Sequence, residues 1–251
     1  NAEILGVVSS GTYAPFWLQS NCNGNISASP YSGNISAGIN KPATQPKRWY
    51  DYDFAVQVTG RVQSDIPISF APYMKTFTGY FNQLYAHFRL YIIDVTAGIN
   101  PITYESIDPQ LSSGSMIFSG NSQPLPRITI GIEDYIPFPG LYGYMELKGG
   151  ITHAWMPDNV YIQGCRLHHK FVGFRFGGRL PVNISYEFHH AAEWGGISPV
   201  YGDVGSDLKS FINVFTAQAG GTMVNDQTNA QGNHVGSQQL ALTAKGEGWI
   251  V

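Results

Sequence analysis

Residues 164–196 decide the fold of this chain, and they read GCRLHHKFVGFRFGGRLPVNISYEFHHAAEWGG. Two alternating segments, residues 167–176 and 180–194, are joined by a glycine-rich turn at residues 177–179. In the second segment one parity is apolar and the other is polar, which is the period of a β-strand. The apolar set is Leu180, Val182, Ile184, Tyr186 and Phe188, and the polar set is Asn183, Ser185, Glu187 and His189. A soluble sandwich buries the apolar face, whereas a transmembrane barrel turns that face to lipid and the polar face to a wet lumen.

The composition favours the lipid-facing alternative. Charged residues make up 12% of the chain and aromatic residues 14%, whereas a soluble domain usually carries about 25% charged residues. The formal net charge of -3 gives no broad basic field, and no Lys/Arg cluster is interleaved with aromatic residues. We therefore expect no nucleic-acid partner. The sequence has no apolar run long enough for a transmembrane helix, which leaves membrane-crossing strands open because they alternate.

The same alternation recurs along the chain and predicts antiparallel β-structure throughout. The predicted strands cover residues 54–63, 83–92, 128–134, 141–155, 167–176, 180–194 and 235–251. Residues 20–49 and 197–231 are rich in Gly, Pro, Asn and Ser, and we expect them to be long exposed loops on the extracellular side. Asp207 is expected to cap a short helix over residues 208–217. The predicted fold is all-β: one antiparallel transmembrane β-barrel domain over residues 1–251.

Polar side chains opposite the apolar rows indicate a network inside the lumen of such a barrel. Its predicted members are His87, Arg89, Arg175, Glu187 and His189, and Lys148 and Lys245 also lie opposite apolar rows. Aromatic residues near the strand ends fit a membrane interface, where one side of the ring is apolar and one edge is wet. These aromatic residues are Tyr80, Tyr91, Tyr142, Trp155 and Trp194.

The histidine pairs 168–169 and 189–190, with Glu193, contain the ligand types of a metal site. Neighbouring residues on a strand point to opposite faces, so each pair offers one imidazole to any one site, and we expect no metal and no other cofactor. Glu187 and Glu193 share a face but lie about 20 Å apart at strand rise, too far for a glycosidase pair. No Gly-x-Ser-x-Gly elbow occurs, so we expect no enzymatic activity. Whether Cys22 and Cys165 form a disulfide is open.

A carbohydrate site would combine aromatic platforms with a few polar groups. The candidate ligand-binding residues near the strand ends are Trp155, Asp158, Arg166, Trp194, Tyr201 and Asp203. For both tryptophans the alternative role is that of an interface anchor.

Six short segments, taken in order, resemble a known family. They are residues 14–18 (APFWL), 143–150 (GYMELKGG), 153–155 (HAW), 167–170 (LHHK), 189–196 (HHAAEWGG) and 232–237 (GNHVGS). Their order and spacing resemble the capsule assembly Wzi family of Gram-negative outer-membrane proteins. The resemblance implies an outer-membrane β-barrel of about eighteen strands that binds capsular polysaccharide and helps to attach or assemble it at the cell surface.

The resemblance also implies where this chain acts and with what. Family members are roughly twice as long, and about nine or ten strands cannot close to their diameter. We therefore expect an N-terminal half whose remaining strands come from a missing C-terminal half, with a partner membrane protein as the source of those strands, or a smaller complete barrel, as the alternatives. The expected location is the outer membrane of a Gram-negative bacterium after signal-peptide removal, and the expected partners are capsular or other surface polysaccharide and outer-membrane lipid. An outer-membrane porin or transport-complex component, or a soluble secreted β-sandwich lectin or enzyme domain, remains the alternative.

Overall fold

The computed structural model describes residues 1–45, 48–64, 77–101, 112, 115–158, 161–221, 224–246 and 249–250. The chain is all-β and antiparallel, as predicted. It divides into two compact units. Unit 1 comprises Asn1–Lys47, Asp51–His87 and Gly98–Pro124, and unit 2 comprises Arg48–Tyr50, Phe88–Ala97 and Leu125–Val251.

Unit 1 is built on an antiparallel ladder at the start of the chain. Strand β1 (Ala2–Val8) pairs with β2 (Tyr31–Lys41), and β2 pairs with β3 (Tyr50–Gln63). The unit also holds the short helix α1 (Phe16–Gln19) and most of β4 (Phe77–Leu90).

The predicted loop over residues 20–49 is wrong in its middle, because β2 occupies residues 31–41 of that span. Ile35 and Ile39 lie on the exposed face of β2, but Ala37 lies between them and Gly33 lies next to Ile35 on the same face. Such small side chains give almost no hydrophobic period, so the alternation that marks a strand was too weak to recognise.

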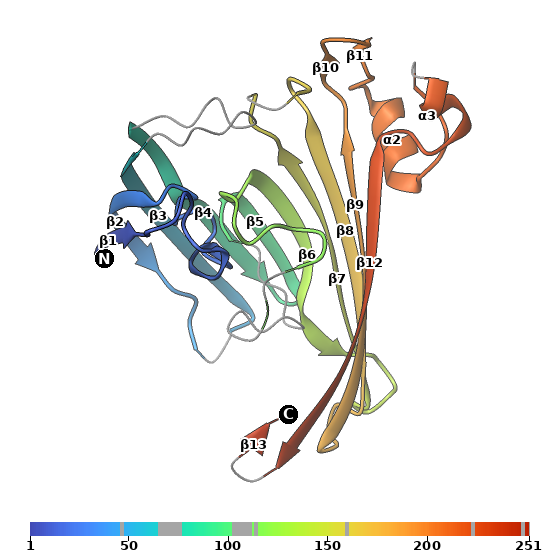
Figure 1. Cartoon of the computed structure of the whole chain (residues 1–251). Helices are drawn as coiled ribbons and strands as arrows, with labels where there is room; N and C mark the ends of the chain where they lie inside the picture. Colours follow the sequence, from blue (N-terminus) through green and yellow to red (C-terminus); the bar gives the residue numbers. More distant parts are fainter. Residues whose placement is uncertain are drawn as a thin grey trace. The chain divides into compact units, whose positions relative to one another are not determined.

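Unit 2 is a meander of long strands that lie side by side in Figure 1. Its main strands are β6 (Pro126–Pro137), β7 (Met145–Trp155), β8 (Arg166–Phe176), β9 (Val182–Trp194) and β12 (Asn233–Gly246). Each pairs antiparallel with the next, and the short β13 (Trp249–Ile250) pairs with the end of β12. Most of β5 (Ile93–Ile99) also belongs to this unit.

The connection between β9 and β12 is folded rather than irregular. It contains β10 (Ile197–Ser198), β11 (Gly202–Asp203), α2 (Leu208–Thr216) and α3 (Val224–Thr228), which gather at one end of β9 and β12 in Figure 1. The predicted cap of α2 is confirmed, because Asp207 accepts a hydrogen bond from the backbone N–H of Ser210 at 2.8 Å. None of the helices in the described chain has both the length and the apolar character that a membrane crossing needs.

The sheet buries its polar face and exposes its apolar face. In unit 2 the polar face of β7 to β9 carries the buried residues Lys148, Thr152, His169, Asn183, Glu187 and His189, and the opposite face of these strands and β12 exposes Ile151, Val172, Val182, Ile184, Leu240 and Leu242. Unit 1 repeats the arrangement, with Asn34, Ser36, Thr59, Arg61 and Gln63 buried and Ile35, Ile39, Val58 and Val62 exposed. Each unit therefore has the reverse of the burial that a water-soluble sheet requires.

Candidate functional site

One face of β7, β8 and β9 carries a connected set of polar side chains, which we call the network face. The strand register places Lys148 opposite Gly173, and Gly173 opposite Glu187. The Lys148 Nζ atom lies 2.8 Å from the Glu187 Oε1 atom. Lys148 is 4% exposed and Glu187 is 1% exposed, so this ion pair is shielded from water and its two charges have to be satisfied by protein groups.

Tyr135 joins this ion pair from β6. The pairing of β6 with β7 shifts between Ile132 and Ile136, and this irregularity lets the Tyr135 hydroxyl donate to Glu187 Oε1 at 3.0 Å. Lys148 Nζ lies 4.8 Å from the centre of the Tyr135 ring, and the Arg175 guanidinium lies 4.4 Å from it. Both cations therefore lie within the range of a cation–π contact with one ring.

Gly173 makes the room that this crossing needs. A Cβ atom at Gly173 would lie 3.0 Å from the Tyr135 hydroxyl and 3.1 Å from two carbon atoms of Lys148. The absence of a side chain at this position therefore allows Tyr135 and Lys148 to pass over β8 and reach Glu187.

Two histidines extend the network along the strands. His189 Nε2 lies 3.2 Å from Glu187 Oε2, and His169 Nε2 lies 3.2 Å from His189 Nδ1. The two imidazole rings are stacked with their centres 5.4 Å apart, and Phe171 stacks against both. Both oxygens of Glu187 are thus bound by protein groups, which gives a satisfied network that fixes these side chains in place.

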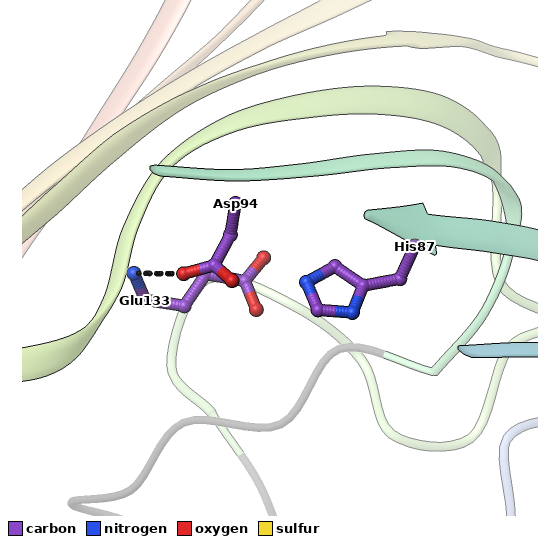
Figure 2. Close-up of side chains that lie close together, drawn as sticks. All are labelled: His87, Asp94 and Glu133. Atoms are coloured by element: carbon purple, nitrogen blue, oxygen red, sulfur yellow. Dashed lines mark hydrogen bonds between the residues drawn. The ribbon is translucent and has the colours of Figure 1, made fainter. Parts of the chain in front are cut away.

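The structure brings together three of the five residues predicted for the lumen network: Arg175, Glu187 and His189. Arg89 belongs to a different cluster in unit 2, where its guanidinium lies 2.6 Å from Asp94 and 2.6 Å from Asp134. Asp94 also accepts a hydrogen bond from the backbone N–H of Glu133 at 3.2 Å, as Figure 2 shows. The remaining predicted member, His87, lies in unit 1 and binds Asp53 there. The side chain of Lys245 lies outside the described residues.

Three of the predicted ligand-binding residues form one row across the ends of β7, β8 and β9. Trp155 lies opposite Arg166, and Arg166 lies opposite Trp194. The Arg166 guanidinium lies 5.1 Å from the centre of the Trp194 ring and donates to the backbone oxygen of Ser206 at 3.0 Å. Trp194 is buried against Phe211 of α2, so its ring is not available as an exposed platform or as an interface anchor. Trp155 keeps an exposed ring surface.

The other three predicted ligand-binding residues lie in the connections at this end of unit 2. Asp158 accepts from the backbone N–H of Gly164 at 3.3 Å, and Asp203 accepts from that of Gly205 at 2.9 Å. Both carboxylates therefore stabilise local turns. Tyr201 lies between β10 and β11 with an exposed side chain, and Tyr161 is exposed in the connection before β8. No pattern in the sequence marks Tyr161, because a single tyrosine in a loop has no periodic neighbours.

The cysteines are both free thiols, so the disulfide left open by the sequence does not form in this structure. Cys165, in the connection that precedes β8, is buried. Burial raises the pKa of its thiol, which keeps the group protonated and unreactive at neutral pH.

Comparisons with known proteins identified no relative of this chain. No protein-family model, no curated protein and no solved structure matches the chain.

Proposed function

We propose that this chain forms part of a non-enzymatic outer-membrane β-barrel that binds surface polysaccharide through the loops at one end of its strands. The observation that supports this proposal most directly is the burial pattern of both units, in which polar residues are buried and aliphatic residues are exposed. Exposed aliphatic rows are unfavourable in water by about 25 cal/mol per Å², whereas in lipid they are the expected outer surface of a barrel. A closed barrel is also the arrangement that would satisfy the edge strands in lipid.

The strand lengths support this proposal. Strands β7 and β8 have 11 residues each and β12 has 14. At about 3.3 Å per residue, 11 residues reach about 36 Å, which crosses a hydrocarbon layer of about 30 Å with a moderate tilt.

The connections of unit 2 support an orientation in the membrane. Residues 138–144 and 177–181 form short connections, and residues 156–165 and 195–232 form longer ones. In an antiparallel meander the two short connections lie at one end of the strands and the two longer ones at the other. Outer-membrane barrels have short turns on the periplasmic side and long loops outside, so we assign Trp155, Tyr161 and Tyr201 to the extracellular end.

The polar faces support attachment rather than passage through a pore. In unit 2 the network face is filled by buried ion pairs and stacked rings. In unit 1 the segment before β2 lies against the polar face, where Arg61 donates to the backbone oxygen of Gly24 and Ser27 donates to Gln63 at 2.7 Å. Filled polar faces of this kind would act as a rigid ionic plug, so we expect no stable ion conductance when the protein is reconstituted in a planar bilayer.

The membrane part of the proposal is tested by fractionating cells that express the chain behind an outer-membrane signal. The chain is expected in the detergent-soluble outer-membrane fraction, with an electrophoretic mobility that changes when the sample is heated. Expression with and without a family-length C-terminal extension separates a chain that inserts by itself from one that needs further strands. Recovery in plain buffer under both conditions would contradict the proposal and favour a secreted lectin.

The binding part is tested with purified capsular polysaccharide and the variants Trp155→Ala and Tyr201→Ala. Aromatic contacts contribute about 0.5–1.5 kcal/mol each, so each variant is expected to weaken binding roughly two- to twelvefold. Tyr142→Ala is the matched control, because Tyr142 is an exposed aromatic residue in the short connection before β7. Equal effects of all three substitutions would contradict a site at the extracellular end.

A further inference from the structure

Helix α2 is held on the face of the sheet opposite the network face by alternate residues of β8. Arg166 donates to the backbone oxygen of Ser206, just before the helix, at 3.0 Å. Lys170 donates to the backbone oxygen of Phe215 in the last turn of the helix, and its Nζ atom lies 4.6 Å from the centre of the Phe215 ring. A cation at a helix C-terminus also interacts favourably with the helix dipole. These two basic residues therefore fasten α2 at both ends.

His168 lies on β8 between these two attachments and directly beneath the helix. Its side chain is 0% exposed. The rings of Phe211 and Phe215 cover it, with centres 5.7 Å and 5.2 Å from the imidazole centre. Neither ring nitrogen of His168 has a hydrogen-bond partner within the described chain. The imidazole is therefore packed as an apolar ring, in a place where a charge would be unsolvated.

The groups whose charge acts on His168 are basic. Its own strand contributes Arg166 and Lys170, the two neighbouring strands contribute His153 from β7 and His190 from β9, and the next strand, β12, contributes His234. His190 Nε2 and His234 Nδ1 lie 2.8 Å apart. Within α2 the charged residue is Lys209. Asp207 caps the start of the helix, where its side chain accepts a hydrogen bond from the backbone N–H of Ser210. A proton on His168 would therefore be repelled by Lys170, and also by the three histidines when these are protonated.

We propose that His168 makes the docking of α2 on β8 sensitive to acid, because a proton on this covered imidazole releases the helix and uncovers the end of the sheet. The released state lets water solvate the charged ring, whereas the docked state holds it between two phenylalanine rings among basic groups. This inference does not depend on polysaccharide binding, and it requires that the end of β8 covered by α2 lies in water rather than in lipid.

The sign and size of the effect follow from proton linkage. A histidine in water takes up a proton near pH 6.5, so the released state binds protons as the pH falls while the docked state does not. Docking is therefore fully favourable at neutral pH and weakens in acid. For one such histidine, the ratio of docked to released molecules falls about 30-fold between about pH 7.5 and pH 5.

The test is hydrogen exchange of the intact chain, followed by mass spectrometry and corrected for the intrinsic pH dependence of exchange. The amides of α2 are expected to lose about 30-fold protection over this pH range, while the central amides of β9 in the same samples stay protected. His168→Phe keeps a buried ring that takes no proton, and it is expected to remove this loss. His87→Gln is the matched control in unit 1 and is expected to leave the α2 response unchanged.

Two results would overturn the inference. One is constant α2 protection across the pH range in the unmodified protein, a measurement that needs no variant. The other is an unchanged pH response in His168→Phe, or in His168→Leu should the phenylalanine variant fail to fold. A loss of protection that extends equally to β9 would indicate general acid unfolding and would also count against it.

Discussion

The two faces of strands β7, β8 and β9 differ in what they leave exposed. On the network face Lys148, Glu187 and His189 are buried, and on the opposite face Ile151 and Val172 are exposed. Both faces come from the same strands, because successive side chains point to opposite sides. Alternation in the sequence therefore identifies two faces of the sheet. Which face is covered by protein and which is exposed follows only from the burial of their residues in the structure.

The opposite face itself has two parts. Its bare part carries the exposed aliphatic rows, while its end near Trp194 is covered by Phe211 and Val214 of α2. The covered part is the conventional apolar cluster, formed by Ala192, Trp194 and Val214. Since packing against a helix buries apolar side chains only at this end, the bare rows need another environment, which we propose to be lipid.

The largest expected effect comes from breaking the ion pair of the network face. Glu187→Leu removes the carboxylate that binds Lys148 and Tyr135, and loss of one partner of a buried pair typically costs about 3–5 kcal/mol. The free energy of unfolding in detergent is expected to fall by this amount. The double variant Lys148→Met with Glu187→Leu should recover most of the loss. A single variant as stable as the unmodified protein would show that the network does not hold the strands together.

The next effect separates lipid from water on the apolar face. Leu240 on β12 is 77% exposed and Leu208 on α2 is 74% exposed, so the two residues form a matched pair. Arginine on the lipid face of a barrel costs about 2–4 kcal/mol near the midplane. Leu240→Arg is therefore expected to impair folding into bilayers, measured as the folded fraction, whereas Leu208→Arg is expected to fold normally. Equal folded fractions for the two variants would contradict the claim that Leu240 faces lipid and Leu208 does not.

A smaller effect is expected where a side chain is added to the network face. Gly173→Ala puts a Cβ atom within 3.1 Å of Tyr135 and Lys148, and overpacking typically costs about 1–3 kcal/mol. Gly60→Ala in β3 is the control, since a Cβ atom there meets no atom within 4 Å. Denaturant unfolding should separate the two variants. Similar stabilities would mean that Tyr135 and Lys148 adjust without loss.

The smallest effect concerns the cap of α2. Hydrogen bonds from the side chain and the backbone of Ser210 lower the pKa of Asp207 below its ordinary value of 3.8. The ionised cap therefore stabilises α2 above that value, and its contribution is lost as the pH falls further. Asp207→Ala should raise exchange of the first-turn amides several-fold at neutral pH, while Asp207→Asn should largely preserve them. This window lies well below the histidine range, so the cap and His168 are distinguishable.

The parts of the fold with strong local signals could be predicted from the sequence. Strands β8 and β9 alternate over many residues, and Asp207 precedes an amphipathic helix, so each of these elements is specified by its own residues. Strand β2 was missed because Gly33 and Ala37 weaken its period. Its pairing with β1 and β3 supplies what the local pattern lacks.

The candidate site could be predicted less well from the sequence, because it depends on contacts between residues that are far apart along the chain. Tyr135 reaches Glu187 through an irregularity in β6 that no spacing rule anticipates. Trp194 has the sequence features of an exposed anchor, but α2 folds back over it. The alternation did place Arg175, Glu187 and His189 on faces that the structure brings together, because parity along paired strands is a local property.

The central claim, that the apolar face lies in lipid, is tested most directly by nitroxide scanning of residues 238–243 in β12. The labels would be placed one at a time in liposome-reconstituted protein with Cys22 and Cys165 replaced by serine. Labels at residues 240 and 242 are predicted to be accessible to oxygen in the bilayer and shielded from a water-soluble nickel reagent, with the labels at 239 and 241 less accessible to oxygen. Access of the nickel reagent to residues 240 and 242 would contradict the account.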